Sequence, residues 1–340
     1  MEEKWLHPLE ELGKEDNDIV GKKCANLGEM AKAGLPVPYG FALSVNAYTS
    51  FLSRTGAGDE IAELVERRPV SPQDIAGINE LSASIRAIVE SKEMTDTMRS
   101  VILSRYDALC ARCNSPDLPV SVRSAGTVSH PGQYETYLNV KGKADLLDKI
   151  RKVWASTFNS RSLAFRLNKG MPLNNEPIGV AILAMVQARS AGIAFSADPN
   201  TGDLTKIIVE ANWGLGESVV SGELMPDRWI LEKESFKILD KTLGKKEKAV
   251  VSGVSGITEE ELSKEKASAF SLSDEEVKGI GKFVVDLETL FGVPQDIEWA
   301  VSTEPSSPPI VLLQARPVVI AKKSTADQVI DMMVNLLTVS

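Results

Sequence analysis

Four polar residues stand in two stretches that otherwise read as buried strands. The stretch DIEWAV carries Asp296 and Glu298, and the stretch IVLLQARPV carries Gln314 and Arg316. Successive side chains alternate along a strand, so the two polar residues of each stretch share one face. Carboxylate and amide oxygens suit Mg²⁺, and arginine binds phosphate through a fork of N–H donors. The pattern fits a metal–phosphate site, and it also fits an edge pair of strands with a solvated polar face.

Three further segments combine turns with groups that can bind phosphate. GKKCANLGEM places Lys22 and Lys23 at a glycine turn that enters a helix. SVRSAGTVSHPGQYET places Arg123 at a strand end, before a small-residue loop whose backbone N–H groups can approach phosphate oxygens. EANWGLGESVVSGELMPD is a second glycine-rich turn. Each segment is common when taken alone, so the prediction of phosphate binding rests on their combination.

Length and composition restrict the class of protein. A single core stops growing near about 250–300 residues, so a chain of 340 residues predicts two lobes. The net charge of -9 argues against nonspecific nucleic-acid binding, which depends on neutralising phosphates. The polar N-terminal segment lacks the apolar region of a signal peptide, and no apolar run approaches the roughly 20 residues that span a membrane. We therefore expect a cytoplasmic protein with neither nucleic-acid nor membrane partners, and its three cysteines agree with a reducing compartment.

The expected secondary structure changes in kind along the chain. Helices dominate the first half, and short strands separated by glycine and proline begin at about residue 179. A capping box from Ser273 to Glu276 predicts one more helix before the two polar strands. The expected regions are an N-terminal lobe over 1–188, a C-terminal lobe over 189–318 and a tail over 319–340. The tail has an apolar side at helical spacing, which fits either packing on its own protein or docking to a partner.

Cysteine and histidine offer two weaker signals. Cys110 and Cys113 form a C-x-x-C pair, but zinc would need two more ligands, and only Cys24, His7 and His130 remain, scattered along the sequence. The pair lies at the end of an expected helix rather than between a strand and a helix start, so a structural role is the favoured interpretation. His130 lies in the small-residue loop, where a water-facing side chain is favoured over a phosphate contact.

The chain resembles the N-terminal ATP-binding domain of phosphoenolpyruvate synthase and pyruvate phosphate dikinase. The resemblance runs from about residue 18 to residue 318. It rests on motifs in a fixed order, which are GKKCANLGEM, VSVRS followed by ETYLNV, GIAFSADPNTG, EANWGLGESVVSGELMPD, PQDIEWAV and LLQARPV. The resemblance implies an α+β architecture of the ATP-grasp fold, with two lobes and ATP in the cleft between them.

The resemblance also implies roles for the polar residues. Lys23 and Arg123 match family residues that contact the phosphates of ATP. Glu298 and Gln314 match the pair that binds Mg²⁺. Arg316 matches the arginine beside that pair, which is expected to stabilise the phosphoryl group during transfer.

Further contacts with ATP are expected around these residues. Ser124, Gly126 and Thr127 follow the phosphate arginine in the small-residue loop and are expected to help bind the nucleotide. The adenine is expected near AILAMV. There Leu183 replaces a glutamine that is common in the synthases, so backbone groups near Ala184 are the expected contacts.

Members of this family usually carry a swivelling domain with a phosphate-accepting histidine and a further domain for the final acceptor. Neither histidine of this chain lies in the carrier context of the family. We therefore expect the chain to bind Mg-ATP and to phosphorylate a histidine on a separate subunit, with AMP and phosphate formed overall. A similar stand-alone arrangement is the ATP-binding subunit of phenylphosphate synthase, which makes phenol the expected final acceptor. A split pyruvate enzyme is the alternative within the class, and a nucleotide-binding regulatory module without transfer activity is the alternative outside it.

Overall fold

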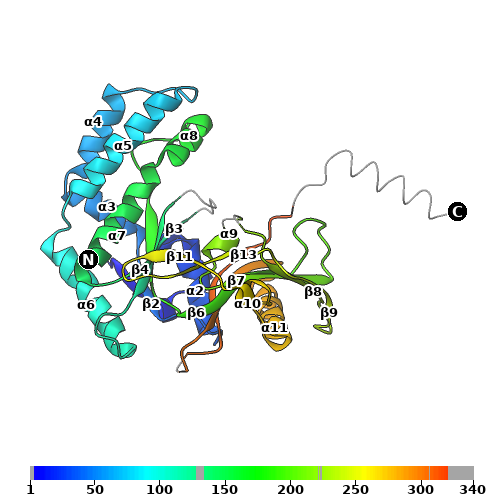
Figure 1. The fold of residues 1–340 in the computed structure, drawn as a ribbon. Coiled ribbons are helices and arrows are strands. Elements are labelled where there is room, and N and C mark those ends of the chain that lie inside the picture. Colours follow the sequence, from blue (N-terminus) through cyan, green and yellow to red (C-terminus); the bar gives the residue numbers. More distant parts are fainter. Residues whose placement is uncertain (1–3, 128–133, 221, 223, 306, 321–340) are drawn as a thin grey trace. The chain divides into compact units, whose positions relative to one another are not determined.

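The computed structural model describes residues 4–127, 134–220, 222, 224–305 and 307–320. His130 and nearly all of the expected tail therefore lie outside the described residues. Contacts divide the chain into two compact units (Figure 1). The first unit holds residues 1–187 together with 251–258, and the second holds residues 188–250 together with 259–340. Each unit combines helices with an antiparallel sheet.

The sheet of the first unit has five strands in the order β1-β2-β5-β3-β4. The strands are β1 (Leu6–Pro8), β2 (Gly40–Leu43), β3 (Val120–Gly126), β4 (Thr136–Val140) and β5 (Ile178–Ala184). The sequence predicts a loop where β4 lies, so that prediction is wrong for these residues. The small and polar residues around β4 favour a loop, but pairing with β3 outweighs that preference. In this pairing Arg123 lies opposite Thr136.

The helices of the first unit supply most of its core. They are α1 (Asn17–Val20), α2 (Lys22–Lys32), α3 (Val45–Arg54), α4 (Ala57–Arg67), α5 (Ile75–Ser91), α6 (Asp96–Arg112), α7 (Lys143–Ala155) and α8 (Ser160–Lys169). Short 3-10 turns occupy Leu9–Glu11, Lys14–Asp16 and Ser156–Phe158. The side chains of Val122 and Ile182 on the sheet and of Trp154 on α7 belong to one fully buried cluster. Burial of such side chains stabilises each by roughly 1.5–3 kcal/mol relative to exposure, and this packing fixes the strand that carries Arg123.

The sheet of the second unit has six strands in the order β13-β12-β6-β7-β8-β9. The elements are β6 (Ala188–Phe195), β7 (Lys206–Trp213), α9 (Glu217–Val220), β8 (Asp227–Glu232), β9 (Ile238–Thr242), α10 (Lys264–Ala267), α11 (Asp274–Phe291), β12 (Gln295–Ser302) and β13 (Ile310–Pro317). The predicted capping box is confirmed, because Ser273 Oγ accepts from Glu276 N–H and the Glu276 carboxylate accepts from Ser273 N–H. Helix α11 packs against the central strands (Figure 1), close to Ile207 and Leu231.

A hairpin of β10 (Lys248–Ser252) and β11 (Ile257–Glu261) leaves the second unit and returns to it. The sequence assigns this segment to the C-terminal lobe, whereas the structure groups its tip with the first unit. The reason is a pair of hydrogen bonds, in which Asn139 Nδ2 donates to Gly253 O at 2.8 Å and to Gly256 O at 2.6 Å. Among the described residues, no helix has both the length and the apolar content needed to cross a lipid bilayer.

Candidate functional site

The two polar strands of the sequence pair directly with each other in the second unit. The register of β12 and β13 places Asp296 opposite Arg316 and Glu298 opposite Gln314. Residues that face each other across an antiparallel pair project to the same face of the sheet. All four polar side chains therefore lie on one face, opposite the face that carries the fully buried Ile297 and that α11 covers.

Asp296 and Arg316 form an ion pair at the edge of this group. Arg316 Nε donates to Asp296 Oδ2 at 2.7 Å. The Asp296 side chain is 9% exposed and that of Arg316 is 31% exposed. Burial raises the pKa of Asp296, and the Arg316 charge acts in the opposite direction. The carboxylate thus holds one edge of a guanidinium that still reaches solvent, a role that the sequence predictions do not assign to Asp296.

Glu298 and Gln314 present oxygen ligands of the kind that Mg²⁺ takes. The neighbouring Asp296 Oδ1 is buried and has no hydrogen-bond partner among the described residues, so the same face offers a further acceptor. The described part of the chain contains no group of three or more His, Cys, Asp or Glu side chains placed to hold a metal. Mg²⁺ commonly takes one or two protein ligands and completes its shell with water and phosphate oxygens. These residues therefore fit Mg²⁺ that is bound together with a phosphorylated ligand.

In the first unit, a glycine turn brings the predicted phosphate lysine to the strand of the predicted phosphate arginine. Lys23 is the second residue of α2, which begins directly after Gly21. Gly21 has a φ of 81°, and a Cβ at this position would lie 1.9 Å from Ala125 O. Arg123 lies two residues before Ala125 and, by the alternation of strand side chains, on the same face of β3.

The buried Cys24 thiol lies within electrostatic range of both cations. Burial raises the pKa of the Cys24 thiol to about 12, and the charges of Lys23 and Arg123 both act in the opposite direction. Helix α2 also packs against β3, so Lys23 and Arg123 lie on neighbouring elements of the first unit. The structure thus brings together Lys23 and Arg123, as it brings together Glu298, Gln314 and Arg316 in the second unit.

The other predicted nucleotide contacts are less uniform. Ser124 is buried and alternates to the face opposite Arg123, so its side chain does not join the two cations. Gly126 ends β3, and Thr127 is half-buried with its carbonyl accepting from Asn17 Nδ2 at 3.2 Å. The backbone N–H of Ala184 donates to Tyr39 O, so the expected backbone donor at this position already has a protein partner.

The second glycine-rich turn divides into two parts with different surroundings. A Cβ at Gly216 would lie 3.5 Å from Ala191 Cβ. The register of β6 and β12 places Ala191 on the same sheet face as Glu298. Asp227, at the end of the motif, is instead fully buried. It pairs with the fully buried Lys246 and accepts hydrogen bonds from Ser271 N–H and Oγ–H. The acidic end of this motif is therefore part of the protein interior.

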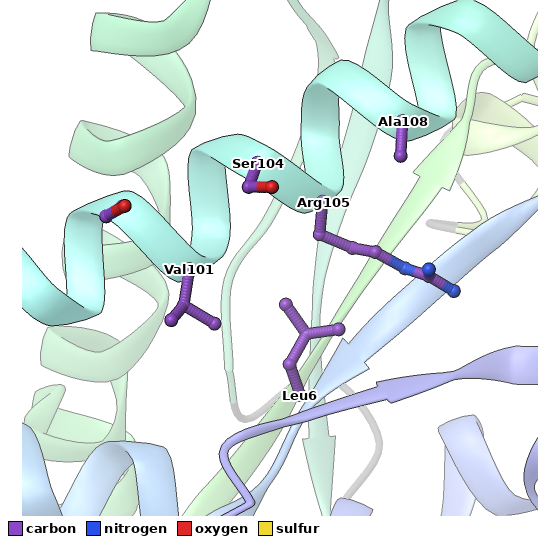
Figure 2. A pocket seen from close by; sticks show the side chains of 6 residues that line it. Leu6, Val101, Ser104, Arg105 and Ala108 are labelled. Carbon is purple, nitrogen blue, oxygen red and sulfur yellow. The ribbon is translucent and has the colours of Figure 1, made fainter.

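Two remaining features of the chain lie outside this group. Cys110 is buried near the end of α6, Cys113 follows the helix, and neither is part of a disulfide. A groove of about 420 Å³ lies between β1 and α6, lined by side chains that include Leu6, Val101 and Arg105 (Figure 2). None of the predicted site residues lines this groove.

The sequence matches the family model described as "Pyruvate phosphate dikinase, AMP/ATP-binding domain" over residues 17–335. The chain belongs to this family. A "Phosphoenolpyruvate synthase" of Aeropyrum pernix is 35% identical over 351 residues, covering 93% of this chain and 42% of the relative. The "Phosphoenolpyruvate synthase" of Pyrococcus furiosus is 32% identical, covering 96% of this chain and 45% of the relative.

A further relative comes from Methanothermobacter thermautotrophicus. It is named "Probable phosphoenolpyruvate synthase" and is 34% identical over 330 residues. The aligned region covers 95% of this chain and 47% of the relative. The chain thus spans less than half the length of these relatives. Membership of the family shows an ATP-binding domain of the dikinase type, whereas the reactions named for the relatives belong to those longer proteins.

Proposed function

We propose that this chain binds Mg-ATP and transfers a phosphoryl group to a histidine on a separate subunit, with water consumed and AMP and phosphate formed in the complete reaction. One observation carries the proposal. The strands β12 and β13 set Glu298 against Gln314, and they set Arg316 against Asp296 on the same face. This set combines oxygen ligands for Mg²⁺ with a guanidinium held for a phosphate group.

The chemistry expected of this chain is positioning and charge neutralisation. Mg²⁺, when bound, would neutralise charge on the phosphate oxygens. Arg316 is oriented by Asp296 and would donate hydrogen bonds to the phosphoryl group as it leaves the nucleotide. Lys23 and Arg123 would bind the remaining phosphates. Phosphoryl transfer demands little covalent chemistry from the protein, so such a set is sufficient for catalysis.

The phosphate acceptor is proposed to lie outside these 340 residues. The chain has two histidines, and His130 is outside the described residues. His7 lies in β1, opposite Ala42 in the register, and burial lowers its pKa. A half-buried histidine in a paired strand is poorly placed to move between two reaction centres, which is what a phosphate carrier does.

The final acceptor of the phosphoryl group is proposed from the relatives and from the resemblance. No described residue has been assigned to binding it. The relatives reported above are named phosphoenolpyruvate synthases, which supports pyruvate as the first acceptor to test. Phenol stays a prediction that rests on the resemblance to a stand-alone ATP-binding subunit.

The proposal is tested with the purified chain, Mg-ATP labelled at the β-phosphate and a candidate carrier polypeptide. We expect acid-labile, base-stable label on the carrier and release of AMP. Glu298→Gln should raise the Mg²⁺ concentration needed for half-maximal transfer by at least about 10-fold, the size of loss seen when partners of metal ligands are removed. Arg316→Lys should slow transfer by roughly 10³-fold, as loss of an arginine does in other phosphoryl transfers.

A matched control is Glu304→Gln, which removes one carboxylate from the exposed loop after β12. It should leave both the Mg²⁺ requirement and the rate unchanged. ATP binding without label on any carrier would favour a regulatory module instead. Normal transfer by the Glu298→Gln protein at low Mg²⁺ would remove the assignment of the metal site.

A further inference from the structure

A second arginine–carboxylate pair lies on the same sheet face as the metal-binding pair. The register places Glu298 opposite Ile193 on β6, Ile193 opposite Glu210 on β7, and Glu210 opposite Arg228 on β8. Residues that are directly paired across neighbouring strands share a face. Gln314, Glu298, Ile193, Glu210 and Arg228 therefore form one lateral row, here called the polar row.

This face is the one that α11 leaves uncovered. Helix α11 approaches Ile207 and Leu231, because a Cβ at Gly281 would lie 3.4 Å from Leu231 Cδ2 and 3.6 Å from Ile207 Cδ1. Ile207 alternates with Glu210 along β7, and Leu231 alternates with Arg228 along β8, so they lie on the opposite face. Helix α9 packs against β6 and β7, and the Gly216 turn lies against Ala191 on this same face. The side chains of Arg228 and Glu210 are nevertheless 37% and 26% exposed, so this end of the polar row can be reached by a ligand.

The Glu210–Arg228 pair has hydrogen-bonding capacity that no described residue uses. Arg228 Nε lies 3.6 Å from Glu210 Oε1, which is too long for a hydrogen bond. Arg228 Nε is also buried without a hydrogen-bond partner among the described residues. The remainder of the side chain reaches solvent, since 37% of it is exposed. Burial raises the pKa of Glu210, and the Arg228 charge acts against that effect.

This arrangement parallels the pair formed by Asp296 and Arg316. Each pair couples a half-buried or buried carboxylate to an arginine whose end is accessible, and the two pairs flank Glu298 on one face. An unused arginine fork beside a metal-binding pair is a complement to a phosphate group. Glu210 would then hold the Arg228 guanidinium over the sheet by charge at 3.6 Å, whereas Asp296 accepts a 2.7 Å hydrogen bond from Arg316.

The spacing selects the length of the anion. Glu298 and Glu210 are two strand spacings apart, or about 9.5 Å between backbones, and the Arg228 guanidinium lies beside Glu210. A single phosphate on a metal at Glu298 and Gln314 is too short to reach that guanidinium as well. A chain of two or three linked phosphates is long enough to contact both.

We propose that Arg228, oriented by Glu210, is a second phosphate-binding arginine that recognises the polyphosphate of a nucleoside triphosphate. This inference rests on the proposed function, because it takes Glu298 and Gln314 as the metal-binding pair. It adds a contact that distinguishes ATP from AMP. Arg228 is the binding residue, and Glu210 is a positioning residue that acts through it.

The inference is tested by equilibrium binding to the full chain in Mg²⁺, using ATP, AMP and inorganic tripolyphosphate as probes. Arg228→Gln should weaken ATP and tripolyphosphate about 10- to 100-fold, the value of charge-assisted hydrogen bonds, and leave AMP unchanged. Glu210→Gln should weaken ATP less. The double variant should lose no more ATP affinity than Arg228→Gln alone, because the two residues act as one unit.

Lys206→Gln is a matched control for the loss of a cation. Lys206 lies on the same face of β7, is 40% exposed and pairs with Asp203, but it stands two rows away from the polar row. Its removal should change none of the three affinities. Arg228→Lys keeps the charge but loses the guanidinium fork, so it should weaken ATP binding by an intermediate amount. This second variant keeps the test decisive if Arg228→Gln fails to fold.

The results separate this inference from the proposed function. Equal weakening of ATP and AMP by Arg228→Gln, or no change in either, would overturn the role of Arg228 while the wild-type chain still binds Mg-ATP. Absence of Mg-ATP binding by the wild-type chain would overturn the proposed function itself. The Mg²⁺ concentration required for ATP binding should rise in Glu298→Gln and stay the same in Arg228→Gln, which assigns metal and phosphate contacts to different residues.

Discussion

Gly21 controls the position of a positive charge although it has no side chain. Its backbone lies so close to β3 that a Cβ would stand 1.9 Å from Ala125 O, and its φ of 81° is one that L side chains rarely adopt. The turn delivers Lys23 to the strand of Arg123 only because both conditions are met. The glycine that the sequence marks as a turn is therefore also a packing contact.

Gly21→Ala should destabilise the protein by about 2–5 kcal/mol, since left-handed backbone strain adds to overpacking against β3. It should also weaken ATP binding, because Lys23 would shift away from Arg123. Gly34→Ala is the control, with a φ of 75° and nothing within 4 Å of the added Cβ. It should cost only about 1–2 kcal/mol by urea denaturation. Equal losses in the two variants would contradict a contact-specific role for Gly21.

Alternation along a strand was sufficient to predict from sequence which of the polar residues share a face. It placed Glu298 with Asp296 and Gln314 with Arg316, and the register then set the two pairs face to face. The register itself is not readable from sequence, because a shift of one residue moves every side chain to the other face. For the same reason Glu210, which belongs to the same row through β6, received no role from the sequence.

At the scale of elements, the β10–β11 hairpin depends on one buried amide. Asn139 is 1% exposed and adopts a left-handed φ of 55°. Its Nδ2 donates to the carbonyls of Gly253 and Gly256 across the hairpin turn. The tip of this hairpin, residues 251–258, is held by that contact within the first unit.

Asn139→Ala should release the hairpin tip, because two backbone carbonyls lose their donor, at a cost of about 1–3 kcal/mol. Hydrogen exchange followed by mass spectrometry should show faster exchange in residues 248–261 and unchanged exchange in α5. Lys141→Ala is the control, since the exposed Lys141 approaches Val254 O at only 3.4 Å. If both variants exchange at the wild-type rate, the amide is not what holds the hairpin.

Sequence signals were strongest for elements with local chemistry. The capping box at Ser273 marked the start of α11 to the residue, because its hydrogen bonds form within four residues. Strands β4, β10 and β11 were not predicted. They are short, and each is defined by its pairing, β4 with β3 and β10 with β11. Elements of that kind are defined by tertiary pairing rather than by a pattern of their own.

At the scale of the whole molecule, each unit has an interior of its own. The first unit buries Trp154 among aliphatic side chains, and the second buries Trp229 and Trp299 completely. The second unit also buries a full ion pair between Asp227 and Lys246. Chain length alone predicts two lobes, but it gives no indication that one of them contains a buried charge pair.

Lys246→Met should destabilise the second unit by about 3–5 kcal/mol, because it leaves the Asp227 carboxylate buried without its cation. Fluorescence of variants that retain only Trp299 or only Trp154 should show the loss at Trp299 first. Lys233→Met is the control, since the pair of Lys233 with Glu288 is partly exposed and worth about 1 kcal/mol or less. A Lys246→Met protein with an unchanged melting curve would show that the pair is dispensable.

The hairpin has a consequence for how the chain acquires its structure during synthesis. Residues 251–258 belong to the first unit, although about sixty residues of the second unit precede them in the sequence. A ribosome that has just released residue 187 has therefore not yet supplied the carbonyls that Asn139 binds. The first unit must therefore wait for a much later segment before the Asn139 amide finds its two carbonyls, so vectorial folding can approach the final state of this unit but cannot finish it.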